Sequence, residues 1–349
     1  MVQVPKNTPK LRVVRSWPRM LVWGVSFAVA GVTMLVVTHA SPSAPDTTTP
    51  RVVSSTHPTT AVATPTSGTL WLPLAEAPID FQVVLGDGLQ LKDPVQAGLR
   101  DFKSATLSSP AVFDLDQAET SATTVGALHA AGKKVICHIE AGEYSIYARD
   151  AKSYQQVNPV IWGAADGVWP GSFWLDIRRV SELEPIIKAK IDDCKGKGFD
   201  AVEPDHMSAW TAASGFPISY QDQLTFNKAV ADWVHKGGMS VGLKNDIEQA
   251  HDLVADFDWA LAENCFKTGT CLEVTPTGSG VDGTRTYPGL TQFVAAGKAV
   301  WVVAFGAQSE EQWTLTCQVA DSHHFNLTTF KLGYPTTGGR MPCRQAATW

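Results

Sequence analysis

The chain has 349 residues, and a hydrophobic content of 44% with 18% charged residues lets it bury a large core. Length alone would allow one large domain or two of ordinary size. The formal net charge of −6 argues against nucleic acid or an anionic membrane surface as a partner.

The first 40 residues have the pattern of an export segment. Five basic residues and no acidic ones precede an apolar run at 21–37, and small residues follow at Ala40 and Ser41. A cleaved signal peptide is favoured, but the run of about 17 residues is also near the lower limit for a membrane anchor. Either alternative predicts that the rest of the chain is extracellular, secreted or tethered facing outside. Without the five basic residues, 23 Lys and Arg stand against 34 Asp and Glu, a net charge of about −11 for residues 41–349.

Residues 41–68 are rich in Ser, Thr and Pro and show no apolar periodicity. Such a segment cannot bury enough surface to offset its chain entropy, so we predict a disordered or extended linker. The sequence thus divides into a signal or anchor segment at 1–40, a linker at 41–68 and one globular domain at 69–349.

Eight short apolar runs bounded by Gly or Asp predict parallel strands buried on both faces. They lie at 81–86, 111–116, 134–139, 173–177, 199–203, 239–244, 259–263 and 298–305. Helices are predicted at 121–131, 181–197, 219–236, 247–257 and 288–296, the second opening on a capping box of Ser181 and Glu184. This alternation predicts an α/β fold, a (β/α)8 TIM barrel. A doubly wound open sheet is the alternative, disfavoured because no phosphate-binding glycine motif follows a strand.

Six cysteines follow the export segment. An even number in an oxidising compartment predicts disulfide bonds, and six cysteines allow fifteen pairings. The favoured set has one bond that staples a short loop, one that ties down the C-terminal tail and one left by elimination: Cys265–Cys271, Cys317–Cys343 and Cys137–Cys194.

Acidic side chains gather at the C-terminal ends of the predicted strands, where the active sites of such barrels lie. One such carboxylate has an ordinary explanation as a helix cap, as for Asp246 before the helix at 247. Many of them at one mouth would repel each other unless a cation or a shared proton relieves them. Glycoside hydrolysis needs two neighbouring carboxyl groups in different states, one protonated and one ionised. The candidates are Asp114, Asp116, Glu140, Asp176, Glu203, Asp205 and Glu263.

Tryptophans are predicted beside these acids, where their faces could stack on sugar rings: Trp162, Trp169, Trp174 and Trp210. Other chemistries have less support. The sequence has no Gly-x-Ser-x-Gly elbow, the motif that would indicate a serine hydrolase. His138 and His206 lie near acids, but no second imidazole stands near a third defined ligand, so we expect no metal and no cofactor.

Several motifs occur in a fixed order along the chain. They are Trp174-Leu175-Asp176, Gly198-Phe199-Asp200-Ala201-Val202-Glu203-Pro204-Asp205, Gly215-Phe216, Leu243-Lys244-Asn245, and Ala262-Glu263-Asn264-Cys265 followed by Cys271. Together they resemble glycoside hydrolase family 114, the endo-α-1,4-polygalactosaminidase family, over residues 71–321.

The resemblance implies a TIM barrel that cleaves α-1,4-linked galactosamine, with Asp205 and Glu263 as the catalytic carboxylates. By analogy with retaining α-glycosidases, Asp205 would be the nucleophile and Glu263 the general acid/base. The expected substrate-binding residues come from two sources. Asp176, Glu203, Lys244 and Asn245 match residues that line the cleft in the family. The other polar or aromatic residues at strand ends are Asp114, Asp116, Glu140, Trp174 and His206.

The expected partner is a cationic amino-sugar polymer, which an acidic mouth would attract, and the expected state is a monomer. The chain departs from the family pattern at His206, where the family usually has Asn, and at His138 and Phe305, where it often has Tyr. These positions bear on substrate choice. The alternatives are a non-catalytic polysaccharide-binding barrel and a hydrolase of another α-linked polysaccharide.

Overall fold

The computed structural model describes residues 70–76, 78–86, 88–101, 106–306, 309–330 and 339–343. The predicted export segment, with its apolar run at 21–37, and the predicted linker lie outside these ranges. Within them, no helix combines the length and the apolar character needed to cross a membrane.

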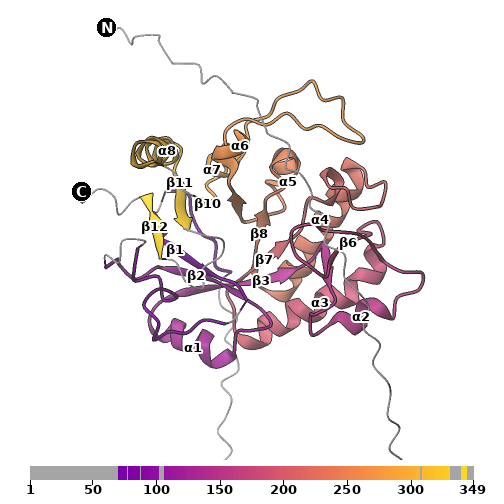
Figure 1. The fold of residues 1–349 in the computed structure, drawn as a ribbon, viewed down its shortest axis with the longest axis horizontal. Helices are drawn as coiled ribbons and strands as arrows, with labels where there is room; N and C mark the ends of the chain where they lie inside the picture. The colour runs from indigo at the N-terminus through magenta and orange to yellow at the C-terminus, as the bar shows by residue number, and fades with distance from the viewer. Residues whose placement is uncertain are drawn as a thin grey trace, which may run out of the picture. The chain divides into compact units, whose positions relative to one another are not determined.

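Eight parallel strands form the main sheet, paired with one another in chain order (Figure 1). A ninth, short strand pairs antiparallel with the last of them. The sheet is a nearly closed barrel of the TIM type. Its strands are β1 (Phe81–Val84), β2 (Val112–Asp116), β3 (Lys134–Glu140), β7 (Ala201–Asp205), β8 (Ser240–Lys244), β9 (Trp259–Glu263), β10 (Val300–Phe305), β11 (Phe325–Phe330) and β12 (Arg340–Pro342).

Polar side chains of β11 and of the edge strand β12 reach the other edge of this sheet at β1. Asn326 on β11 accepts the Ile79 N–H at 2.9 Å and donates to the Val300 carbonyl at 3.2 Å. Arg340 on β12 is fully buried, donates to the Phe81 carbonyl at 3.4 Å and pairs with Asp80. Side-chain hydrogen bonds therefore link β11 and β12 to the β1 edge, where the nearly closed barrel has no backbone ladder between β1 and β11.

Two apolar layers hold the domain together. Inside the barrel, buried side chains from several strands form one cluster, among them Phe81, Trp259, Trp301 and Phe330. A larger layer fills the space between the sheet and the surrounding helices. The helices are α1 (Ala122–Ala130), α2 (Ala151–Gln155), α3 (Val180–Lys197), α4 (Tyr220–Gly237), α5 (Ala250–Leu253), α6 (Cys265–Thr268), α7 (Thr291–Ala295) and α8 (Glu310–Ser322), with 3-10 turns η1 (Ala209–Thr211) and η2 (Ile247–Gln249).

Local sequence signals explain where the long helices begin and end. Ser219 and Asp222 form a capping box at the start of α4, and Gly198 ends α3 in a left-handed conformation. The capping box predicted for Ser181 and Glu184 is wrong. Because α3 already begins at Val180, the Ser181 hydroxyl donates to Glu182 instead, at 2.7 Å.

One predicted barrel strand belongs elsewhere. The run at 173–177 corresponds to β6 (Ser172–Leu175), which pairs antiparallel with β4 (Glu143–Ser145) and β5 (Trp162–Ala165) in a separate three-stranded side sheet. The eighth barrel strand is β11, which the sequence analysis did not predict. Its sequence, FNLTTF, carries polar side chains that are buried because they close the barrel and bond to β10.

The three disulfide bonds match the favoured pairing. Cys137 on β3 is bonded to Cys194 on α3, and Cys265 to Cys271 within the loop after β9. Cys317 on α8 is bonded to Cys343 directly after β12. The first and third bonds therefore attach helices to the barrel wall.

Candidate active site

The backbone turns sharply after three neighbouring strands. The residue after Asp205, Lys244 and Glu263 has a positive φ in each case: 60° at His206, 52° at Asn245 and 55° at Asn264. Residues other than glycine rarely adopt this left-handed conformation, and such turns concentrate at functional sites. The turns fix where β7, β8 and β9 end, and so place the three preceding side chains at one mouth of the barrel.

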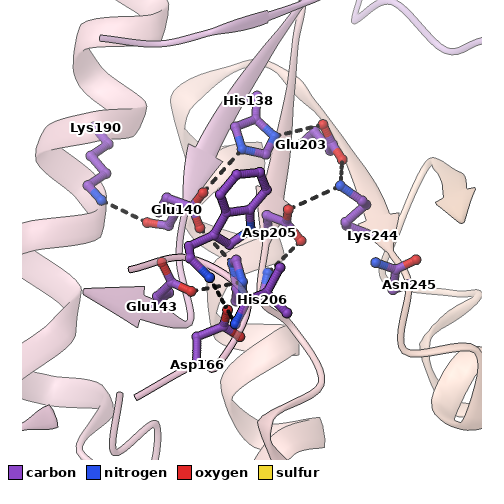
Figure 2. A network of polar contacts seen from close by, with 12 residues as sticks. His138, Glu140, Glu143, Asp166, Lys190, Glu203, Asp205, His206, Lys244 and Asn245 are labelled. Atoms are coloured by element: carbon purple, nitrogen blue, oxygen red, sulfur yellow. Dashed lines mark hydrogen bonds and ion pairs between the residues drawn. The ribbon is translucent and has the colours of Figure 1, made fainter. Parts of the chain in front are cut away.

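Lys244 links two carboxylates of β7 (Figure 2). Its Nζ lies 2.7 Å from Glu203 Oε1 and 3.1 Å from Asp205 Oδ2, and its side chain is completely buried. Asp205 Oδ1 also accepts the His206 backbone N–H at 2.7 Å. The Asp205 carboxylate thus contacts both a cation and a backbone N–H donor.

Glu263 is held by a different partner. The Asn245 side chain donates to Glu263 Oε2 at 3.2 Å and accepts the Glu263 backbone N–H at 2.9 Å. Asn264 makes the equivalent link to the next strand, where its side-chain oxygen accepts the Phe305 N–H at 2.8 Å. Glu263 thus contacts a neutral amide in the same cleft in which Asp205 contacts an ammonium group.

A buried charge network lies beneath the cleft. Burial alone would raise the pKa of Glu203, but Lys244 and His138 outweigh it and hold that pKa well below its usual value. Burial and the nearby charge of Glu203 raise the pKa of Asp114 well above its usual value, so the neutral form of Asp114 is favoured. His138 Nδ1 lies 3.0 Å from Glu203. The Lys244 ammonium group and the His138 imidazolium group therefore offset the negative charge of Glu203, and the neutral Asp114 adds none.

His206 connects the barrel with the side sheet. Its Nδ1 lies 2.7 Å from Glu140 on β3, and its Nε2 lies 3.0 Å from Glu143 on β4. Desolvation would lower the pKa of His206, but Glu140 and Asp205 raise it well above 6.5. Gly142 permits this geometry, because a Cβ there would lie 1.9 Å from the His206 carbonyl oxygen. The imidazolium form is favoured, and it bridges two carboxylates beside Asp205.

Asp205 and Glu263 line one open cleft of about 1820 Å³, together with Asp116, Glu140, His206 and Asn245. Trp174 on β6 also lines it and meets the His206 ring edge-on, with the ring centres 5.3 Å apart. Trp210 does not, because it is buried and its Nε1 donates to Asp246 at 3.0 Å. Asp246 accepts this bond and one from Asn227, and its side chain makes no capping hydrogen bond to η2, which follows it.

The remaining predicted site residues lie apart from the cleft surface. Asp114, Glu203 and Lys244 are buried beneath it. Asp176 directly follows the side-sheet strand β6 and makes a two-point ion pair with Arg178 at 2.7 and 2.8 Å. Asp176 is not among the residues that line the cleft, and its expected contact with substrate stays a prediction.

Two residues that line the cleft were not in the expected substrate-binding set, His138 and Glu143. Both come from the stretch at the end of β3, where His138, Glu140 and Glu143 surround the glycine needed for close packing. These carboxylates and imidazoles could also hold a metal ion by distance, as His138–Glu140–Asp205 or as Glu140–Glu143–His206. In both sets the imidazole nitrogens already lie against carboxylate oxygens.

Comparisons with known proteins add to this geometry. The model of glycoside-hydrolase family GH114 matches residues 63–340. Ega3 of Aspergillus fumigatus, solved as a complex with galactosamine, is similar in structure with a TM-score of 0.63 and 21% identity, over 79% of this chain and 98% of that one. The glycoside hydrolase domain of PelA from Pseudomonas aeruginosa matches with a TM-score of 0.48 and 12% identity, over 74% and 96%. A sequence comparison with curated proteins found no match.

Proposed function

Because the chain belongs to glycoside-hydrolase family GH114, we propose that this glycoside hydrolase cuts an α-1,4-linked galactosamine polymer internally, with Asp205 and Glu263 as its catalytic pair. One observation carries the choice of residues. Asp116 and Glu140 line the cleft as well, but Asp205 and Glu263 line it from β7 and β9 with different contacts, the Lys244 ammonium group for Asp205 and the Asn245 amide for Glu263. Unequal surroundings are what separate the roles of two catalytic carboxylates.

The contacts favour Asp205 as the nucleophile. Lys244 and the His206 N–H stabilise its negative charge, so it can attack the anomeric carbon and form a covalent glycosyl-enzyme. Glu263 would give its proton to the leaving glycosidic oxygen and then take one from the water that releases the second product. The sugar would leave with the configuration that it had in the polymer.

The charge of the site supports a cationic substrate. Acidic groups at or beneath the cleft outnumber their basic partners, and residues 41–349 carry about 11 more acidic than basic residues. Free amino groups make a galactosamine polymer a polycation, which such a mouth would attract. Ega3, which shares the fold, was solved with galactosamine. We also propose that the protein works outside the cell as a monomer, where its three disulfide bonds would persist.

A panel of polymers tests this proposal. The protein should release a ladder of oligosaccharides from α-1,4-linked galactosamine and little from its fully N-acetylated form or from neutral α-glucans. Proton NMR of the first product should show the α-anomer. Binding to the polymer with no release of oligosaccharides would favour a non-catalytic barrel, and faster cleavage of a neutral polymer would refute the substrate.

A further inference from the structure

The side sheet exposes two aromatic rings. Tyr147, two residues after the end of β4, is 77% exposed, and Trp169, in the loop between β5 and β6, is 59% exposed. In the part of the chain that the structure describes, every other tryptophan is buried or half-buried. Val168 and Ile146 beside them are also exposed, at 72% and 45%. We call these four side chains, Ile146, Tyr147, Val168 and Trp169, the aromatic rim.

The rim is held in place by specific contacts. A Cβ at Gly171 would lie 2.6 Å from the Tyr147 ring, so the ring rests on a backbone that only glycine provides. The Ile146 N–H donates to the Gly171 carbonyl at 3.0 Å. Asp166 accepts the backbone N–H groups of Val168 and Trp169 at 3.0 and 3.1 Å. The two rings are therefore presented by a fixed loop, which lowers the entropy lost when a ligand binds.

The rim belongs to the same cleft as the catalytic pair. Tyr147, Val168 and Trp169 line this cleft together with Asp205 and Glu263. A polymer that is cut internally must extend beyond the cleavage point on both sides. A protonated amino sugar suits an aromatic wall, because its apolar C–H face can stack on a ring and its ammonium group can make a cation–π contact.

We propose that Tyr147 and Trp169 form a distal subsite that binds galactosamine units of the polymer away from the bond being cut. This inference rests on the proposed function. The subsite contributes affinity for long chains and takes no part in bond cleavage. Short oligosaccharides that occupy only the sites next to Asp205 and Glu263 gain nothing from it.

Kinetics on long and short substrates test the subsite. In Tyr147→Ala and Trp169→Ala, KM for the polymer should rise about tenfold at unchanged kcat, while both constants for the shortest cleavable oligosaccharide stay the same. Tyr147→Phe keeps the ring and should behave as the wild type. Leu315→Ala, which removes an exposed apolar side chain on α8 outside the cleft, is the matched control. An unchanged polymer KM in both alanine variants would overturn the proposal.

Binding separates this inference from the proposed function. In a Glu263→Gln background, isothermal titration with the intact galactosamine polymer should show affinity about tenfold weaker on Trp169→Ala substitution, whether or not the parent protein cleaves this polymer. If the wild-type protein does not cleave the polymer, only the proposed function is refuted. If the Glu263→Gln protein binds the polymer equally well with and without Trp169→Ala, only the subsite is refuted. A change of oligomeric state on Trp169→Ala substitution, measured by sedimentation, would assign the aromatic rim to self-association instead.

Discussion

At the scale of single residues, Lys244 is the group on which the site depends most. It is completely buried between Glu203, which is 1% exposed, and Asp205. Removing one partner from a buried ion pair leaves an uncompensated charge and costs about 3–5 kcal/mol. Lys244→Met should lower the free energy of unfolding by that amount in chemical denaturation. Lys236→Met, which breaks an exposed pair with Asp232, should leave it unchanged.

A double variant separates stability from catalysis at the same position. Lys244→Met with Glu203→Gln removes the buried cation and the deepest anion together, so much of the lost stability should return. Activity should not return, because Asp205 still lacks the ammonium group 3.1 Å from its carboxylate. Recovery of both stability and kcat would contradict the role given to Lys244.

The sequence predicted which residues meet at the mouth better than it predicted their depth. Strand-end position brings Asp205, Lys244 and Glu263 together, because parallel strands end at one face. It does not tell whether a side chain points to the cleft or to the interior, so Asp114 was expected at the surface and is buried. The sequence places Glu143 three residues after Glu140, but it does not show that Glu143 reaches the site on a separate sheet.

At the scale of elements, the closure of the barrel rests on Arg340. Its guanidinium group is fully buried and donates to the carbonyl groups of Gly98 and Ser108 at 2.9 and 3.0 Å, besides pairing with Asp80. Arg340→Met should lower the free energy of unfolding by at least about 3 kcal/mol, measured by denaturant titration. Arg149→Met, at an exposed pair with Glu119, is the control, and an equal effect of both variants would contradict this role.

The two strand assignments that failed have a common cause. Apolar periodicity predicts burial, and β6 is an apolar run that packs in the side sheet, whereas β11 is a barrel strand with buried polar side chains. Asn326 and Thr329 are paired within the barrel, so their polarity carries little cost there. Tertiary partners of this kind are not visible in a single sequence, while the seven strands with ordinary apolar patterns were placed correctly.

At the scale of the whole molecule, the imidazole–carboxylate network should make stability depend on pH. The pKa of His206 is raised above 6.5, so its contribution is complete below pH 6.5 and is lost as the pH rises through the folded value. The pKa of Glu140 is lowered below 4.5, chiefly by His206 against the effect of burial, so its contribution is complete above pH 4.5 and is lost as the pH falls. This network therefore stabilises the fold most between about pH 4.5 and 6.5.

Thermal unfolding across pH measures this dependence. The wild type should lose more stability between pH 6.5 and 9 than His206→Asn, which has no titrating ring at that position. Parallel curves for the two proteins over this range would show that His206 does not carry a raised pKa. His323→Asn, at a half-buried residue at the end of α8, controls for the loss of a histidine.

The rate of reducing-end release from α-1,4-galactosamine tests most directly whether Asp205 and Glu263 together cleave the polymer. Asp205→Asn and Glu263→Gln should each lower this rate by about 10²–10⁴-fold or more while keeping the wild-type circular dichroism spectrum. Asp232→Asn on α4 and Glu311→Gln on α8, matched changes of exposed carboxylates, should keep the full rate. A wild-type rate in a folded Asp205→Asn or Glu263→Gln protein would contradict the account.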